Sequence, residues 1–175
     1  MAPREPLRDE VDAIVAAWRR ERPDLDFAPL EIGSRITRLA RHLDRQRAGA
    51  FGGHGLESWE FDVLAALRRS GEPYQLSPGQ LMRETMVTSG TMTNRVDRLE
   101  ASGLVEREEH PDDRRGILVR LTPRGREAVD AALADLIVAE RRILAALPAD
   151  EQAALIRALR RLLAPYGRQP PRKPA

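Results

Sequence analysis

The sequence of 175 residues contains no cysteine, and aromatic residues make up only 4% of it. Without cysteine there is no disulfide framework, no thiol nucleophile and no Cys-based zinc or redox site. The histidines His42, His54 and His110 lie far apart and lack the HExxH or similar spacing of metal ligands. No apolar run approaches the roughly 18 residues that span a membrane, and the N-terminal MAPREPLRDE has no apolar signal core. We therefore expect a cytoplasmic protein without a metal site, a cofactor or a membrane partner.

An excess of charge of one sign is also missing. The chain has 29 basic and 27 acidic residues, which gives a formal net charge of +2. Net charge alone therefore does not identify a nucleic-acid binder, although a local basic surface can still supply a salt-sensitive attraction to phosphates. The hydrophobic fraction of 42% is sufficient for a core, and the length predicts one domain or one domain with extensions.

The clearest pattern lies between Val87 and Ser102. Wound at 3.6 residues per turn, this segment has an apolar side and a polar side. The apolar side consists of Met92, Val96 and Leu99, and the polar side of Thr91, Asn94 and Arg98. The apolar side would dock the helix on a domain, while short polar side chains and arginines match the base edges and phosphates of a DNA major groove. Taken alone, the segment leaves a solvated surface helix open as the alternative.

The neighbouring segments favour DNA recognition. Ser77 caps a short helix over 78–84 that begins with proline, so a helix, a brief turn and a second helix follow one another. Gly103 ends the second helix, and two β-prone runs, LVERE and ILVRL, enclose the turn HPDDRRG. Two helices followed by a hairpin with a basic tip are typical of a winged helix-turn-helix. We therefore predict a recognition helix over 88–102 and a wing over 109–116 that reaches the minor groove or the phosphates.

Helices flank this unit on both sides. Apolar stripes predict helices from Leu7 to just before Pro23, over about 28–50, over 57–69, over 123–147 and through Leu163. The segment SGEPYQLSP is expected to be a loop. The outer helices carry many apolar positions without enclosing the small central unit, so pairing with a second chain would bury them. The alternative is that they fold back on their own domain.

The predicted fold is mainly α (α+β), a winged helix-turn-helix whose N- and C-terminal helices form a dimerisation region. We expect an N-terminal extension over 1–27 with one added helix, a main domain over 28–165 and a disordered tail over 166–175. Within the main domain, a DNA-reading head covers about 57–121, and dimerisation helices cover about 28–50 and 122–165. A two-fold dimer would present two heads to successive major grooves and so prefer a palindromic site.

The stretch TSGTMTNRVDRLEASGLVEREEHPDDRRGILVRLTPRG resembles the MarR family of bacterial transcription regulators, and the resemblance extends over about 28–165. It implies a homodimer that binds a palindromic double-stranded DNA operator, usually as a repressor, and leaves DNA when a small ligand binds. The implied groove contacts are Thr88, Ser89, Thr91, Asn94 and Arg95. In the wing, the resemblance implies that Asp113 holds Arg115 in the minor groove and that Arg114 contacts a phosphate. Ser77 and Arg98 complete the predicted DNA-binding residues.

The helix before residue 28 resembles that of the urate-responsive subgroup of this family. In that subgroup a tryptophan, an aspartate and an arginine frame a ligand crevice, which implies a site at Trp18, Asp62 and Arg95. The subgroup's asparagine about two turns after the aspartate is replaced here by Ser70. The implied effector is a small anion: urate or another purine, or a carboxylate such as trans-aconitate. The alternatives are a core or interface role for Trp18 and a solvated carboxylate for Asp62.

Two other classes of function are alternatives to a ligand-responsive repressor. A constitutive or architectural DNA-binding protein would have the same head without an effector pocket. An enzyme has little support, because Asp112 with Asp113, or Asp62 with His54, lacks a nucleophile, base and orienting group at interpretable spacing. We therefore predict no catalytic residues.

Overall fold

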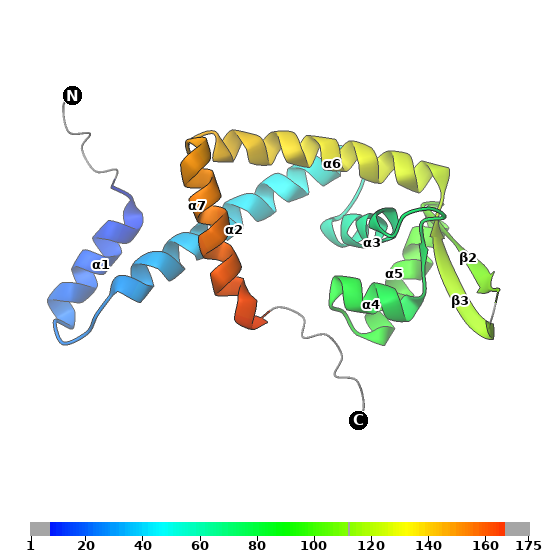
Figure 1. The fold of residues 1–175 in the computed structure, drawn as a ribbon, viewed down its shortest axis with the longest axis horizontal. Coiled ribbons are helices and arrows are strands. Elements are labelled where there is room, and N and C mark those ends of the chain that lie inside the picture. Colours follow the sequence, from blue (N-terminus) through cyan, green and yellow to red (C-terminus); the bar gives the residue numbers. More distant parts are fainter. Residues whose placement is uncertain (1–7, 112, 167–175) are drawn as a thin grey trace.

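A computed structural model describes residues 8–111 and 113–166, with side chains for all of these except 110 and 113–115. The reading head contains three helices and a small sheet (Figure 1). Its elements are α3 (Ser58–Arg69), β1 (Gln75–Leu76), α4 (Pro78–Thr85), α5 (Ser89–Ala101), β2 (Val105–His110) and β3 (Asp113–Leu121). This is the winged helix-turn-helix architecture that the sequence predicted, in a mainly helical chain.

The remaining helices form an arm that extends to one side of the reading head (Figure 1). The arm consists of α1 (Glu10–Glu21), α2 (Ala28–Gly52), α6 (Pro123–Leu144) and α7 (Ala149–Leu163), followed by a 3-10 turn over Ala164–Tyr166. Tyr166 belongs to this turn and not to the predicted disordered tail over 166–175. The other residues of that tail, 167–175, lie outside the described residues. Among the residues described, no helix is long and apolar enough to cross a membrane.

Local capping explains where several helices begin. The Ser77 hydroxyl accepts the backbone N–H of Gln80, with Pro78 as the first residue of α4. Thr122 caps α6 in the same way by accepting the N–H of Gly125. A side-chain acceptor followed by proline satisfies first-turn donors and presets the backbone, so these starts were predictable from short segments.

The sheet corrects one expectation. The predicted loop SGEPYQLSP contains β1, which pairs antiparallel with β3 through Gln75 opposite Arg120 and Leu76 opposite Val119. The strand order is β1-β3-β2. A strand of two residues is too short to show a period in sequence, and it exists only because β3 offers a free edge.

The core of the reading head forms around α3 and α5. Phe51 of α2 stacks on Phe61 of α3 with 4.0 Å between ring centroids. The apolar row of α5 is buried against this core as predicted, and its members are Met92, Val96 and Leu99. Burying that row leaves the opposite side of α5 in solvent.

The N-terminal helix α1 docks on α2 rather than on the reading head. Val11 and Val15 pack with Phe27 in a small second core. Around it, Arg35 of α2 pairs with Asp9 and Asp12, both at 2.8 Å. The pKa of Asp9 is lowered chiefly by its hydrogen bond with Arg35, because that bond stabilises the charged carboxylate.

A dense joint connects the end of α5 to the start of α6. The Thr122 hydroxyl donates to the carbonyl oxygen of Gly103 at 2.9 Å, and the Thr122 N–H donates to that of Leu104 at 3.2 Å. Arg124 donates to the carbonyl oxygen of Ser102 at 3.0 Å. At Gly125 the backbones approach so closely that an added Cβ would lie 2.0 Å from the Leu104 carbonyl oxygen. The start of α6 and the end of α5 are therefore held in one relative orientation.

This contact predicts a stability effect. Gly125→Ala should lower the free energy of unfolding by about 1–3 kcal/mol, because backbone must move to admit the methyl group. Thermal melting would measure this as a drop of several degrees in Tm. The matched control is Gly49→Ala, where an exposed helical glycine has nothing within 4 Å of an added Cβ. That control should be neutral or slightly stabilising; equal melting of both variants would refute the close approach at Gly125.

Candidate nucleic-acid interface and ligand residues

The solvent side of α5 carries the polar residues predicted to contact DNA. Thr88 is the N-cap residue, and its hydroxyl lies 3.0 Å from that of Thr91. The exposed side chains are those of Thr88, Ser89, Thr91, Asn94 and Arg98, while Arg95 is half-buried at the edge of this face. No side chain caps the first turn of α5, so its backbone N–H groups remain available to an anion.

Two arginines of this face are anchored by α3. The guanidinium carbon atoms of Arg95 and Arg98 lie 5.4 and 4.7 Å from the centroid of the Trp59 ring. Glu57 accepts a hydrogen bond from the Trp59 indole at 2.8 Å and another from Arg98 at 2.6 Å. These two hydrogen bonds, that of Trp59 first, hold the pKa of Glu57 below its usual value. Trp59, Arg95 and Arg98 line a shallow hollow of about 410 Å³ with Gly90, Thr91 and Asn94.

Sequence reasoning missed Trp59 as part of this surface. Trp59 lies four positions before Val63, so helical spacing puts both on one apolar row of α3; the Trp59 ring does contact the core, but it is only half-buried. The rest of its ring faces α5 instead. No spacing rule within α3 indicates this, because the contact depends on how α5 crosses α3.

The base of the wing is tied to α5 by charged pairs. Arg107 of β2 pairs with Asp97 and Glu100 of α5, and its pKa is raised chiefly by the hydrogen bond with Asp97. On the neighbouring strand, Arg120 pairs with Glu108 at 2.7 Å. The backbone of 113–115 belongs to β3, but the predicted contacts of Asp113, Arg114 and Arg115 concern side chains outside the described residues.

Ser77 has a local structural role. Its side chain caps α4 and is half-buried. It thereby positions α4 ahead of the turn into α5.

The three residues of the expected ligand crevice have separate surroundings within one chain. Trp18 is 49% exposed and stacks on Phe27 at 6.4 Å between ring centroids. Asp62 accepts a hydrogen bond from Arg47 at 3.2 Å. Arg95 lies over Trp59, as described above. One chain therefore does not bring Trp18, Asp62 and Arg95 together.

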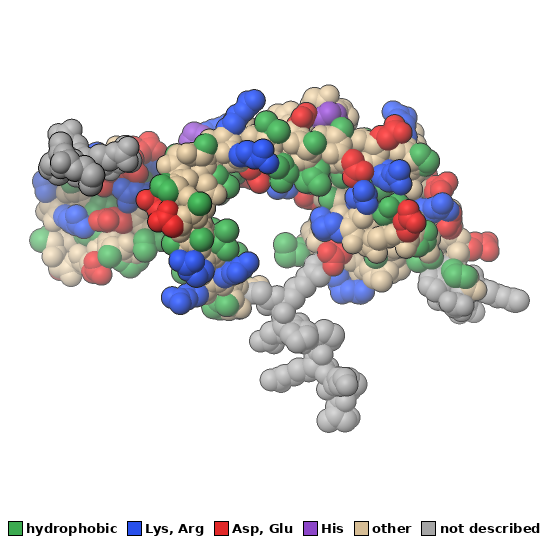
Figure 2. All heavy atoms as spheres, turned by 45° about the horizontal axis from the view of Figure 1, so that its top comes forward, with side chains coloured by type: hydrophobic (Ala, Val, Ile, Leu, Met, Phe, Trp, Pro, Cys, Tyr) green, Lys and Arg blue, Asp and Glu red, His purple; other side chains and the backbone are tan. Residues whose placement is uncertain are grey.

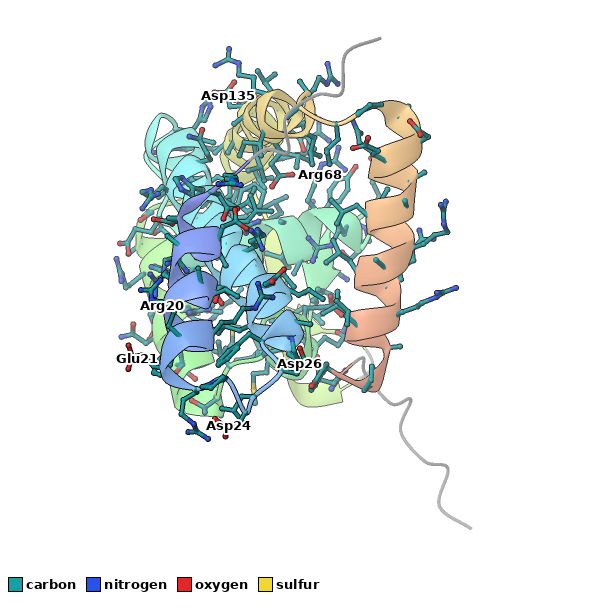
Figure 3. The ribbon with its side chains drawn as sticks, turned by 90° about the vertical axis from the view of Figure 1, so that its left-hand side faces the viewer. Arg20, Glu21, Asp24, Asp26, Arg68 and Asp135 are labelled. Carbon is teal, nitrogen blue, oxygen red and sulfur yellow. The ribbon has the colours of Figure 1, made fainter. Side chains whose placement is uncertain are left out.

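Figure 3 looks along the arm toward the reading head, with α1 in front. Arg20 and Glu21, which follow Trp18 closely in sequence, lie on the outer end of α1, nearest the viewer. Asp62 lines a hollow of about 600 Å³ between α2, α3 and α6, with the charged residues Asp44, Arg47 and Glu140. Ser70 lies at the far end of α3, where its hydroxyl donates to the Leu67 carbonyl oxygen at 2.7 Å.

Comparisons with known proteins agree with this geometry. A family model described as MarR family matches residues 54–116. The HTH-type transcriptional regulator PecS of Dickeya dadantii is 37% identical over 146 residues, which cover 83% of this chain and 88% of PecS.

Solved structures give the same result. A MarR family transcriptional regulator from Streptomyces coelicolor has a TM-score of 0.67 and 28% identity, covering 81% of this chain and 97% of that one. A mutant MarR from E. coli complexed with operator DNA has a TM-score of 0.66 and 25% identity, covering 89% of this chain and 99% of that one.

These relatives are DNA-binding transcriptional regulators and not enzymes, and their similarity covers both the reading head and most of the arm. Together with the winged helix-turn-helix geometry, the similarity to PecS shows that this chain belongs to the MarR family of transcriptional regulators.

Proposed function

We propose that the chain acts as a homodimeric repressor that binds a palindromic operator and is released by a small anionic ligand. The observation that carries the DNA-binding part is the two-sided packing of α5. Its apolar row is buried, and a polar face with Asn94, Arg95 and Arg98 is presented beside the hairpin. Such a face suits a major groove, with α5 as the recognition helix and the tip of the hairpin as the wing.

Dimerisation is supported by the unburied apolar side chains of the arm. None of the residues of α7 is buried. Exposed large apolar residues lie on α2, α6 and α7: Ile32, Ile36, Leu39, Leu133, Ile137, Val138, Leu144, Ile156, Leu159, Leu162 and Leu163. Figure 2 shows an open space between α7 and the reading head, with apolar side chains at its border. A second copy of the chain would bury these surfaces and present two reading heads about one turn of DNA apart.

The ligand crevice, in this proposal, is assembled between subunits. Trp18 lies on the arm, remote from its own reading head, and a two-fold dimer built on α2, α6 and α7 would carry it toward the partner's head. Asp62 and Arg95 would come from that head. An anion pairing with Arg95 would draw it from Trp59, and its charge would repel Asp62 from Arg47. Both changes would move α5 and so lower the affinity for DNA.

A constitutive DNA-binding protein without an effector is the second candidate. The observation that favours it is that Asp62 and Arg95 already have partners within the chain, Arg47 and Trp59. The charge of Asp62 is compensated by Arg47, and Arg95 is held by a cation–π contact, so neither residue needs a ligand to keep its place.

Asn94→Ala tests base recognition. If Asn94 reads a base, discrimination between operator and random DNA should fall by about 1–3 kcal/mol. Fluorescence anisotropy with an operator selected from random-sequence duplexes would measure it. Thr93→Ala is the matched control, because the Thr93 hydroxyl is already bonded to the Ser89 carbonyl oxygen at 3.2 Å. An equal loss on both DNAs would mean that Asn94 contacts only the backbone.

Arg115→Ala tests the wing. It should weaken operator binding by reducing insertion of the wing into the minor groove, and it should lower the slope of log K against log salt by about one unit, because one cation close to the DNA is lost. The control is Arg142→Ala in the last turn of α6, far from the hairpin. An Arg115→Ala variant with the affinity and slope of the wild type would remove Arg115 from the interface.

The ligand is tested by thermal shift with urate, xanthine, citrate, trans-aconitate and salicylate. At a concentration of about 100 times its Kd, one anion should raise the Tm of the wild type by several degrees. The same anion should not raise the Tm of Trp18→Ala or Arg95→Ala. A dimer of one Trp18→Ala subunit and one Arg95→Ala subunit should regain about half of the binding sites. One of its two crevices combines the intact Trp18 of one subunit with the intact Arg95 of the other. No shift with any anion would favour the constitutive protein, and no recovery in the mixed dimer would place the crevice within one subunit.

A further inference from the structure

Trp59 belongs to α3, yet its ring contacts two arginines of α5. It is the second residue of α3, and its half-buried ring packs partly against the head core. Arg95 and Arg98 lie three positions apart on α5, hence on neighbouring turns of one face, and both guanidinium groups contact this ring. A single aromatic side chain therefore restricts two cations of the proposed DNA-binding surface.

Glu57 fixes the ring from its edge. One carboxylate oxygen accepts the indole N–H at 2.8 Å and the other accepts Arg98 at 2.6 Å. Glu57 is itself the N-cap residue of α3, and its backbone N–H donates to the side chain of Glu60 at 2.9 Å. The carboxylate that orients Trp59 and Arg98 is thus held at the start of a buried helix.

Arginine side chains lose conformational entropy when they bind, and prior restriction reduces that cost. Random DNA can be bound by mobile cations through electrostatic attraction, whereas a specific site requires cations at defined positions. Restriction by Trp59 should therefore favour the operator more than DNA in general.

We propose that Trp59 is a positioning residue for operator recognition, which holds Arg95 and Arg98 in the orientation that the operator requires. The proposal rests on the DNA-binding role proposed for α5. In this proposal a residue outside the helix-turn-helix contributes to operator recognition. Trp59 would affect sequence preference by restricting the arginines, without contacting a base itself.

The main test is Trp59→Leu, with binding measured by anisotropy on an operator selected from random-sequence duplexes by the wild type and on a shuffled duplex. Loss of two cation–π contacts should raise the Kd for the operator on the order of tenfold. The Kd for shuffled DNA should change less than about twofold. Trp59→Phe keeps a ring face for the two guanidinium groups but loses the indole N–H that Glu57 accepts, so it should recover only part of the affinity.

The matched control is Tyr74→Leu. Tyr74 also packs partly against the head core and also has two guanidinium groups over its ring, those of Arg68 and Arg126 at 5.0 and 5.8 Å. It lies ahead of β1 and away from α5. Tyr74→Leu should therefore leave the ratio of operator to shuffled affinity unchanged, even if it lowers the Tm as much as Trp59→Leu does.

A double-mutant cycle separates positioning from stability. In an Arg95→Ala, Arg98→Ala background, Trp59→Leu should cause no further loss on the operator, because the groups it positions are gone. Glu57→Gln, which keeps the side-chain shape, provides a second test if Trp59→Leu does not fold, and its effect should likewise vanish in the Arg95→Ala, Arg98→Ala background. A loss that persists in these backgrounds, or one that is equal on both duplexes, overturns the proposal. A wild-type chain that selects no sequence would instead overturn the proposed function.

Discussion

The orientation of α6 relative to α5 depends on the joint where α6 begins. Thr122 bonds to the carbonyl oxygens of Gly103 and Leu104 just after α5 ends, and Gly125 allows the two backbones to touch. A larger residue at 125 would separate them. The start of α6 and the end of α5 are therefore joined by close backbone contacts.

The second constraint is the division of α5 into two faces. Met92, Val96 and Leu99 are buried in the head core, which determines the rotation of the helix about its axis. The polar face has no such packing, and its arginines would be mobile if they were simply solvated. Contacts from α3, through Trp59 and Glu57, restrict Arg95 and Arg98 instead. The core thus orients the helix, while side chains of α3 orient the residues that it presents.

The predicted crevice illustrates that residue patterns predict which side chains face outward but not which of them lie close together. Trp18, Asp62 and Arg95 were assigned by resemblance, and within one chain they lie near Phe27, Arg47 and Trp59 respectively. Stripes in α1, α3 and α5 could indicate which side chains face outward, yet not which helices would lie close together. The short strand β1 was missed for a related reason. Gln75 of β1 pairs with Arg120, which lies on a strand far along the chain, so no local period in the sequence indicates the pairing.

By itself, the sequence determined the features that are local. The apolar row of α5, the caps at Ser77 and Thr122, and the helix end at Gly103 depend on residues within one or two turns of each other. Tertiary structure alone decided the rest: that β1 joins the sheet, that Trp59 holds two arginines of α5, and that α7 has no buried residue. The physical reason is distance along the chain. Capping hydrogen bonds and the helical period involve residues a few positions apart, whereas these contacts arise only when segments remote in sequence pack together.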